Sequence, residues 1–242
     1  MTTLIRVYNS PDLYVDGLGI SWASNTTLTI ATGSCRDSTN AADLVISSAK
    51  TLNAAVVGLN GIDTGTFAAS TTYAVFVIGD SSGYKPTGVI MSLSTTAPTL
   101  PFGYDLIRRI GWGCSDVSTH FYSMHQSGSG KLRSYLMDIA HTILSGGTSA
   151  TFADVAIGPA LPIASKLYLQ ADHIANAAED KFYVKSPGDS VGLVMTNSVA
   201  GKKNSYSIMV MSGLAGGVQK ISYKVDASGN LSLYMVGFDD SL

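Results

Sequence analysis

The residues that could support catalysis or metal binding are few and widely spaced in this chain. A hydrolase needs a nucleophile, a base and an orienting group, but no Gly-x-Ser-x-Gly elbow is present, and residues 127–130 (Ser-Gly-Ser-Gly) predict a hairpin turn instead. His120 and His125 are five residues apart, so on one strand they would face opposite sides, which does not suit a shared metal ion. His141 and His173 are isolated and are expected on the surface or hydrogen-bonded in a core. We expect no catalytic residue and no metal site.

The acidic residues do not form the carboxylate pair that glycoside hydrolysis needs. Glu179 is the only glutamate, and residues 17–19 (Gly-Leu-Gly) lack the third glycine of a dinucleotide-binding loop. We expect no enzyme activity and no cofactor, and a polysaccharide depolymerase that uses aspartates alone is the competing hypothesis. Six aspartates stand in predicted turns, where such side chains accept backbone N–H bonds: Asp37, Asp80, Asp116, Asp154, Asp189 and Asp226.

The two cysteines, Cys35 and Cys114, have neither metal-ligand spacing nor a nearby histidine at such spacing. They are interpreted as small buried hydrophobic residues, and a single disulfide between them is the alternative. So few cysteines are typical of a protein made in a reducing cytosol. The N-terminus has no apolar core of a signal peptide, and no run of 18 apolar residues occurs. We therefore expect neither a signal peptide nor a membrane span.

The composition is unusual for a soluble domain because charge is scarce. Of 242 residues, 45% are hydrophobic and only 13% are charged, against about 25% charged in a typical domain. Ser and Thr supply about a fifth of the chain, which suits strands with a hydroxyl-bearing face, or surfaces that lie against other subunits. The net charge is −2. The basic pairs at 108–109 and 202–203 are too sparse to follow a phosphate backbone, so nucleic acid is not an expected partner.

Strand patterns recur along the chain, with turn residues between them. Residues 72–78 are apolar on both faces, which predicts a central strand, and two prolines in residues 96–103 predict an ordered crossover loop. Two hairpins are predicted: one joins 120–126 to 132–137, and the other joins 221–225 to 231–236. Together these patterns predict an all-β fold, an antiparallel β-sandwich of jelly-roll type.

Three segments allow other interpretations. Residues 131–144 also fit helical spacing, but no N-cap signature precedes them, so strands are favoured. Residues 171–180 predict a short helical turn or loop. Residues 1–25 contain Asn-Ser-Pro and Gly-Leu-Gly breaks and are expected to form an irregular N-terminal arm or attachment segment. The sandwich is then expected over 26–242, as one domain or as two packed sub-domains divided near residue 145.

Exposed aromatic side chains could stack on sugars, as in carbohydrate-binding modules. Burial of the same rings in the core or in a subunit interface is the favoured alternative. Solvent-facing Trp or Tyr beside Asp or Asn would favour glycan binding, whereas burial would favour a purely structural role. The candidates are Trp22, Trp112, Tyr122, Tyr168, Tyr183 and Tyr234.

Three stretches, residues 28–46, 60–78 and 94–112, resemble tailed-bacteriophage virion proteins of the tail fibre or minor structural protein kind. A weaker similarity covers 143–170, and the last 60 residues show none. The resembling motifs are turns and strand edges, such as Thr-Ala-Pro-Thr-Leu-Pro-Phe-Gly-Tyr at 96–104. The resemblance implies a β-rich virion component in an oligomeric appendage, and it implies no catalytic residues.

The resemblance and the composition together predict a non-enzymatic structural component of a phage virion, in the tail or a fibre-like appendage, assembled in the host cytoplasm. The expected partners are further copies of the chain, in a homotrimer, and other virion proteins. Two alternatives stay open: a head-decoration or head-fibre protein, and a module that binds a host receptor or glycan at the tip of an appendage.

Overall fold

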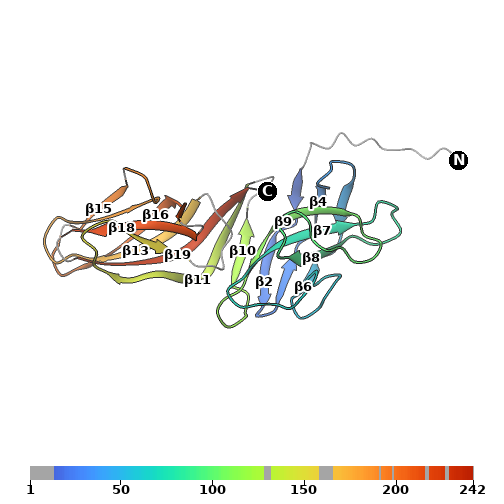
Figure 1. The fold of residues 1–242 in the computed structure, drawn as a ribbon, viewed down its shortest axis with the longest axis horizontal. Coiled ribbons are helices and arrows are strands. Elements are labelled where there is room, and N and C mark those ends of the chain that lie inside the picture. Colours follow the sequence, from blue (N-terminus) through green and yellow to red (C-terminus); the bar gives the residue numbers. More distant parts are fainter. Residues whose placement is uncertain are drawn as a thin grey trace.

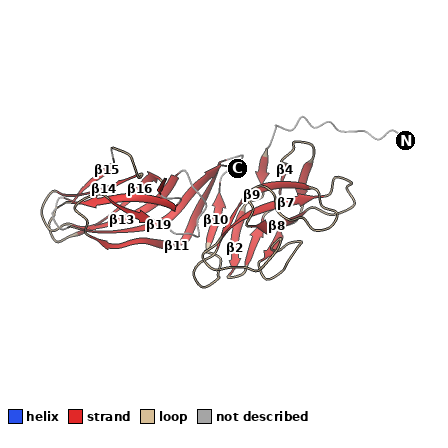
Figure 2. Cartoon of the chain, in the orientation of Figure 1, coloured by secondary structure: helices blue, strands red, loops and turns tan. Residues whose placement is uncertain are grey.

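The computed structural model describes residues 14–127, 132–157, 166–190, 192–197, 199–215, 218–226 and 229–241. These residues form strands, turns and bends and contain no helix, as Figure 2 shows. The predicted all-β, sandwich-like fold is confirmed. In the described part of the chain, no helix has the length and apolar character needed to cross a bilayer.

The strands form two lobes that follow one another along the long axis of the molecule (Figure 1). The N-terminal lobe contains β1 (Val15–Gly17), β2 (Ile20–Ser24), β3 (Thr27–Ile30), β4 (Gly33–Arg36), β5 (Asp43–Ile46), β6 (Lys50–Asn53), β7 (Thr72–Gly79), β8 (Gly88–Ser92), β9 (Leu106–Cys114) and β10 (Met124–Ser127). The C-terminal lobe contains β11 (Leu132–Gly147), β12 (Ala153–Ala156), β13 (Lys166–Ile174), β14 (Asp180–Lys185), β15 (Leu193–Asn197), β16 (Lys203–Met211), β17 (Gly213–Ala215), β18 (Val218–Val225) and β19 (Asn230–Ser241).

One eight-stranded sheet runs through both lobes, in the order β16-β13-β19-β11-β10-β2-β3-β6. The first part of β11 pairs with β10, with Met137 opposite Met124, while β19 pairs along the other side of β11. Between Leu136 and His141 the β11–β19 register shifts. Such a bulge bends a strand, and here it lies where β11 passes from one lobe to the other.

The C-terminal lobe has the strand order of a jelly roll. Numbering β11 to β16, β18 and β19 from one to eight gives facing sheets with orders 1-8-3-6 and 2-7-4-5. This is the arrangement of two interlocked Greek keys. All six pairings within these sheets are antiparallel, and β17 adds a short strand beside β18.

The predicted hairpin between 221–225 and 231–236 is wrong. Both segments are strands, but β18 pairs with β12 and β14, whereas β19 pairs with β11 and β13. The connection between them crosses from one sheet to the other. Alternation correctly identified the buried faces, Ile221 and Val225 on one strand and Leu231 and Leu233 on the other. Those faces meet across the sandwich. The hairpin prediction is wrong because alternation identifies the buried face of a strand but not the strand that pairs with it.

The central strand predicted at 72–78 is confirmed as β7, which lies between β8 and β9. Its two faces belong to two different cores. Tyr73, Val75 and Val77 pack in the core of the N-terminal lobe. Ala74, Phe76 and Ile78 belong to a second cluster that continues into the jelly roll. A strand buried on both faces has no polar side, which explains the unbroken apolar run.

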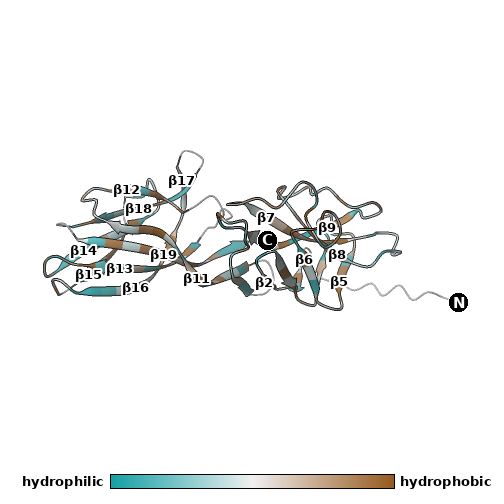
Figure 3. Cartoon of the chain, turned by 90° about the horizontal axis from the view of Figure 1, so that it is seen from below, coloured by the Kyte–Doolittle hydropathy of each residue, from teal (hydrophilic) through white to brown (hydrophobic). Residues whose placement is uncertain are grey.

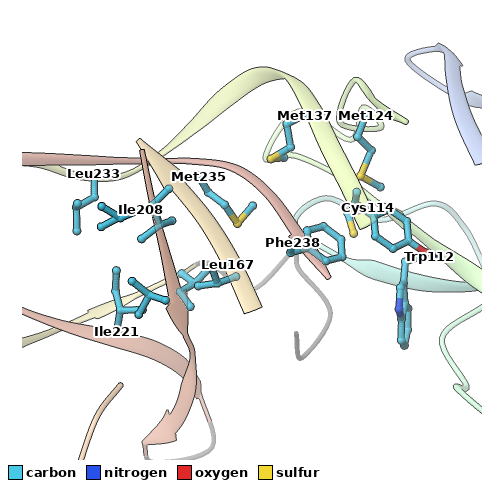
Figure 4. Close-up of a cluster of buried hydrophobic side chains, with 14 of the residues drawn as sticks. Trp112, Cys114, Met124, Met137, Leu167, Ile208, Ile221, Leu233, Met235 and Phe238 are labelled. Carbon is cyan, nitrogen blue, oxygen red and sulfur yellow. Dashed lines mark hydrogen bonds between the residues drawn. The ribbon is translucent and has the colours of Figure 1, made fainter. Parts of the chain in front are cut away.

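The second cluster joins the lobes into one packed body. Figure 4 shows it extending from Ile208, Ile221 and Leu233 between the jelly-roll sheets to Met235 and Phe238. From there it continues to Trp112, Cys114, Met124 and Met137 at the junction of the lobes. Figure 3 shows hydrophilic and hydrophobic residues interleaved along the strands of both lobes. Polar and apolar residues therefore alternate along the strands, and the apolar ones supply the two buried clusters.

Two segments differ from their sequence-based prediction. Residues 15–25 are not irregular, since β1 pairs with β4, and β2 pairs with β3 and β10. Gly17 has a φ of 65° and lies against the carbonyl of Thr32, so this glycine makes the turn between two strands. Residues 1–13 of the expected arm lie outside the described residues. Residues 171–174 belong to β13, where Ala171 and His173 are fully buried, and only 175–179 form a turn.

Residues 131–144 follow the favoured prediction from Leu132 onward, because β11 is a strand there. The hairpin between β10 and β11 is also confirmed by their pairing, although residues 128–131 of its turn lie outside the described part.

Candidate functional site

A cleft of about 530 Å³ lies where the two lobes meet. This volume falls within the range of small-molecule sites, about 300 to 1,000 Å³. Three elements line it. The end of β2 and its turn supply Trp22 and Asn25, the loop after β9 supplies residues from Asp116 to Ser123, and the bulged part of β11 supplies Ile139 to Thr142.

Hydrogen bonds hold the loop that lines the cleft. The Asp116 carboxylate accepts backbone N–H bonds from Ser118 at 2.8 Å and from His120 at 2.9 Å. The backbone N–H of Phe121 donates to the carbonyl of Asn25 at 2.8 Å, which fixes the loop to the β2–β3 turn. The N–H of Tyr122 donates to the carbonyl of Cys114 at 2.9 Å. The cleft is therefore preorganised by backbone contacts.

Two aromatic rings form one wall of the cleft. Tyr122 and His141 meet edge to face, with ring centroids 5.4 Å apart and planes at 71°. Burial lowers the pKa of His141 and raises the pKa of Tyr122, so both rings are neutral at pH 7. Trp22, a residue that is 38% exposed, adds a third aromatic ring. Among the residues that line the cleft, Asp116 is the only carboxylate, and none is Lys or Arg.

The histidines are less isolated than their spacing predicts. His120 and His141 both line the cleft. At its rim, Asp138 accepts a bond from the Ser123 hydroxyl at 2.6 Å and lies 3.3 Å from Nδ1 of His125. His173 lies elsewhere, fully buried in the jelly roll, with its ring 5.2 Å from that of Phe182. In the described part of the chain, no group of three His, Cys, Asp or Glu side chains could hold a metal ion.

Several of the turn aspartates organise their own loops, as predicted. Asp37 accepts backbone N–H bonds from Thr39, Ala41 and Ala42. Asp80 accepts them from Ser82, Tyr84 and Lys85. The prediction is wrong for Asp154, which lies within strand β12 and accepts a bond from the hydroxyl of Ser222 on the neighbouring strand at 2.6 Å. These carboxylates serve the fold.

Cys35 and Cys114 are both free and buried, and they lie in different hydrophobic clusters. Burial raises the pKa of each thiol to about 12. The interpretation of both residues as small hydrophobic side chains is confirmed, and the alternative of a disulfide between them is wrong.

No protein-family model, curated protein or solved structure matches this chain.

Of the six candidate aromatic residues, Trp22 and Tyr122 line the cleft. The indole of Trp112 is buried and donates to Asp240. The hydroxyls of Tyr168 and Tyr183 donate to Asp239 and Asp226 at 2.8 and 3.3 Å, and Tyr234 is half-buried on β19. No sequence pattern predicts that Trp22 lies beside the loop at 116–123 and beside β11, since these segments are far apart along the chain.

A second surface feature lies at the open side of the jelly roll. Among the described strands, β15 and β16 end their sheets and pair on one side only. Four apolar side chains are exposed on these strands: Leu193, Val194, Met209 and Met211. We call this group the apolar edge. Leu193, Met209 and Met211 also line one shallow hollow, so the two strand edges lie side by side.

Proposed function

We propose that this protein is a non-enzymatic structural component of a phage virion, located in the tail or a fibre-like appendage. Copies of the chain associate through the apolar edge of the jelly roll into a symmetric oligomer, with a trimer as the working hypothesis. The resemblance of residues 28–46, 60–78 and 94–112 to tail fibre and minor structural proteins supports the class of protein. The apolar edge supports self-association.

The single structural observation that carries the proposed self-association is the exposure of Met209 and Met211 on an edge strand, 56% and 52%. An edge strand presents unpaired N–H and C=O groups, and proteins usually protect such an edge with charge or cover. On β15 and β16, exposed apolar side chains lie along the unpaired edge. Apolar patches of this kind mark protein–protein contacts, and a neighbouring subunit would cover this one.

Native mass spectrometry at micromolar protein concentration tests the oligomer. We expect the intact chain to be a trimer and the double variant Met209→Glu/Met211→Glu to be a monomer, because two carboxylates would be desolvated in the contact. Leu93→Glu is the matched control, since Leu93 is 66% exposed in the other lobe. A monodisperse wild-type monomer would count against the proposal, as would loss of the oligomer in the control.

Electron microscopy of intact particles labelled with an antibody against the chain tests the location. Label along the tail or its fibres supports the proposal. Label on the head would favour the alternative of a head-decoration or head-fibre protein, and particles without label would contradict a role in the virion.

A second function, recognition of a host glycan at the tip of an appendage, is favoured by one specific observation. A partly exposed indole, Trp22, lies in the same cleft as the polar side chains of Asn25 and Asp116. This is the combination of aromatic and acceptor groups that separates a binding module from a purely structural one.

A further inference from the structure

We infer that the cleft between the lobes is a binding site for a neutral saccharide, which stacks on Trp22 and is held by hydrogen bonds from the loop at 116–123 and from β11. This inference rests on the second function proposed above, glycan recognition, and deepens it by naming the class of ligand and the residues that bind it; it does not depend on the oligomer. The aromatic surface, the charge and the rigidity of the cleft all favour such a ligand.

The aromatic surface suits one face of a sugar ring. A pyranose has an apolar face of C–H groups and an equator of hydroxyls, and the negative face of an aromatic ring attracts the polarised C–H groups. Trp22 is 38% exposed. Tyr122 and His141 hold each other edge to face at 5.4 Å and form a second apolar surface. An indole that served only as core would be buried, as that of Trp112 is.

The polar groups of the cleft favour a neutral ligand rich in hydroxyls. Asn25, His120, Ser123 and Thr142 offer amide, imidazole and hydroxyl groups that can both donate and accept. Because no Lys or Arg is among the lining residues, the cleft lacks the cations that recognise phosphate, sulfate or carboxylate groups. The single lining carboxylate, Asp116, already accepts two backbone bonds, which does not provide the several oxygen ligands of a hard cation.

The cleft is held in shape before a ligand arrives. The loop is fixed to the β2–β3 turn through Phe121 and Asn25, and to β9 through Tyr122 and Cys114. On the opposite wall, the register shift between Leu136 and His141 sets the path of β11. A preorganised site loses little conformational entropy on binding. We therefore expect measurable affinity for a single sugar unit, with a Kd on the order of 1 mM.

Saturation-transfer NMR and tryptophan fluorescence test the inference with the intact chain. The probes are lactose, maltose and diacetylchitobiose as neutral disaccharides, with sialyllactose as the charged comparison. The chain has two tryptophans, and Trp112 is buried, so a change in emission on titration reports on Trp22. We expect binding of at least one neutral probe, with affinity for sialyllactose no higher than for lactose.

Two variants identify the site. Trp22→Ala removes the stacking surface and should weaken binding at least tenfold. Thr142→Arg leaves the aromatic rings in place but fills the cleft from an exposed position on β11, and it should abolish binding while the thermal unfolding midpoint is unchanged. Tyr84→Ala is the matched control, because Tyr84 is 92% exposed outside the cleft, and it should bind as the wild type does.

Three results would overturn the inference: no neutral probe binds at about 10 mM, tenfold above the expected Kd; binding survives in both cleft variants; or sialyllactose alone binds. Protection of 116–123 and 139–142 from hydrogen exchange in the oligomer, lost on dissociation, would assign the cleft to a subunit contact instead. None of these outcomes changes the native mass or the particle labelling, so failure of this inference is distinguishable from failure of the proposed function.

Discussion

The indole Nε1–H of Trp112 donates a 2.6 Å hydrogen bond to Oδ2 of Asp240, and this bond joins the N-terminal lobe to the last strand of the jelly roll. The same carboxylate oxygen lies 3.1 Å from the guanidinium of Arg109. That guanidinium also lies over the Trp112 ring, 4.6 Å from its centroid. One residue of β19 thus holds two residues of β9, in a place where little water reaches.

Replacing Asp240 should loosen the connection between the lobes. We expect Asp240→Ala to lower the free energy of unfolding by about 1.5 to 3 kcal/mol, because the buried indole N–H and the guanidinium lose a charged acceptor. Urea denaturation followed by tryptophan fluorescence measures this change. Asp189→Ala, at an exposed aspartate, is the control and should be close to neutral. Equal effects in the two variants would show that the bond contributes nothing.

Gly111 provides the space for a buried hydroxyl. The Tyr135 hydroxyl accepts bonds from the backbone N–H of Trp112 at 3.1 Å and from Nε2 of Gln126 at 2.8 Å. A Cβ at position 111 would collide with this hydroxyl and would lie 2.6 Å from Nε2 of Gln126. We expect Gly111→Ala to cost about 1 to 3 kcal/mol of stability, as overpacked sites do.

Thermal unfolding of Gly111→Ala beside Gly19→Ala tests this prediction. A Cβ at Gly19 finds its nearest neighbour at 3.7 Å, an ordinary contact, so that variant should keep the wild-type midpoint. A wild-type midpoint for Gly111→Ala would contradict the packing described for Tyr135.

The two thiols should be unreactive in the folded protein and should make it sensitive to alkali. Burial raises the pKa of Cys35 and Cys114 from 9.0 to about 12. A raised pKa means that the folded state binds the proton more tightly, so stability is fully present below pH 9 and is lost as pH rises towards 12.

Thiol titration with Ellman's reagent at pH 8 should therefore count no reactive groups in native protein and two in denaturant. Denaturation at several pH values should show a loss of stability above pH 9 that is smaller in Cys114→Ala. Rapid labelling of the native protein would contradict the burial of these side chains.

Asp37 should make the loop at 37–42 sensitive to acid. Burial raises its pKa, but the hydrogen bonds from the Thr39 hydroxyl and the backbone of Ala42, Thr39 and Ala41 outweigh burial and lower the pKa below its usual value of 3.8. Because the folded pKa is the lower one, this carboxylate stabilises the fold above about pH 4 and loses its effect as pH falls through the folded pKa.

Asp37→Asn should consequently be less stable than the wild type at pH 7 by about 1 to 3 kcal/mol, and the difference should narrow below pH 4. Denaturant unfolding at pH 7 and at pH 3 measures both values. Asp189→Asn is the control, and a difference that is constant with pH would contradict the assigned hydrogen bonds.

Predicted and observed elements agree where the sequence pattern and the contacts that it predicts lie within a few residues of each other. Residues 72–78 were identified as a central strand because seven consecutive residues carry the pattern. The Asp80 turn was identified because its hydrogen-bond partners lie within five residues. The hairpin predicted for β18 and β19 failed because a turn-like sequence between two alternating strands fits both a hairpin and a crossing between sheets.

The prediction of an irregular arm at 1–25 is wrong over residues 15–25 for a related reason. Gly17 breaks a pattern in the sequence, but in the fold it makes a tight turn against Thr32, and β1 and β2 find their partners in strands that come later in the chain. A short strand is stabilised by its neighbours more than by its own residues.

By itself, the sequence determined that the chain is all-β, which faces of its strands are buried, and that Asp37, Asp80 and Asp116 serve turns, because alternation and turn chemistry act over a few residues. Only the tertiary structure decided which strands are neighbours, how β7 contributes to two cores, and that Trp22 shares a cleft with His141. It also placed Trp112 beside Asp240, 128 residues later. Contacts over such distances depend on the packing of whole sheets, and no local pattern carries that information.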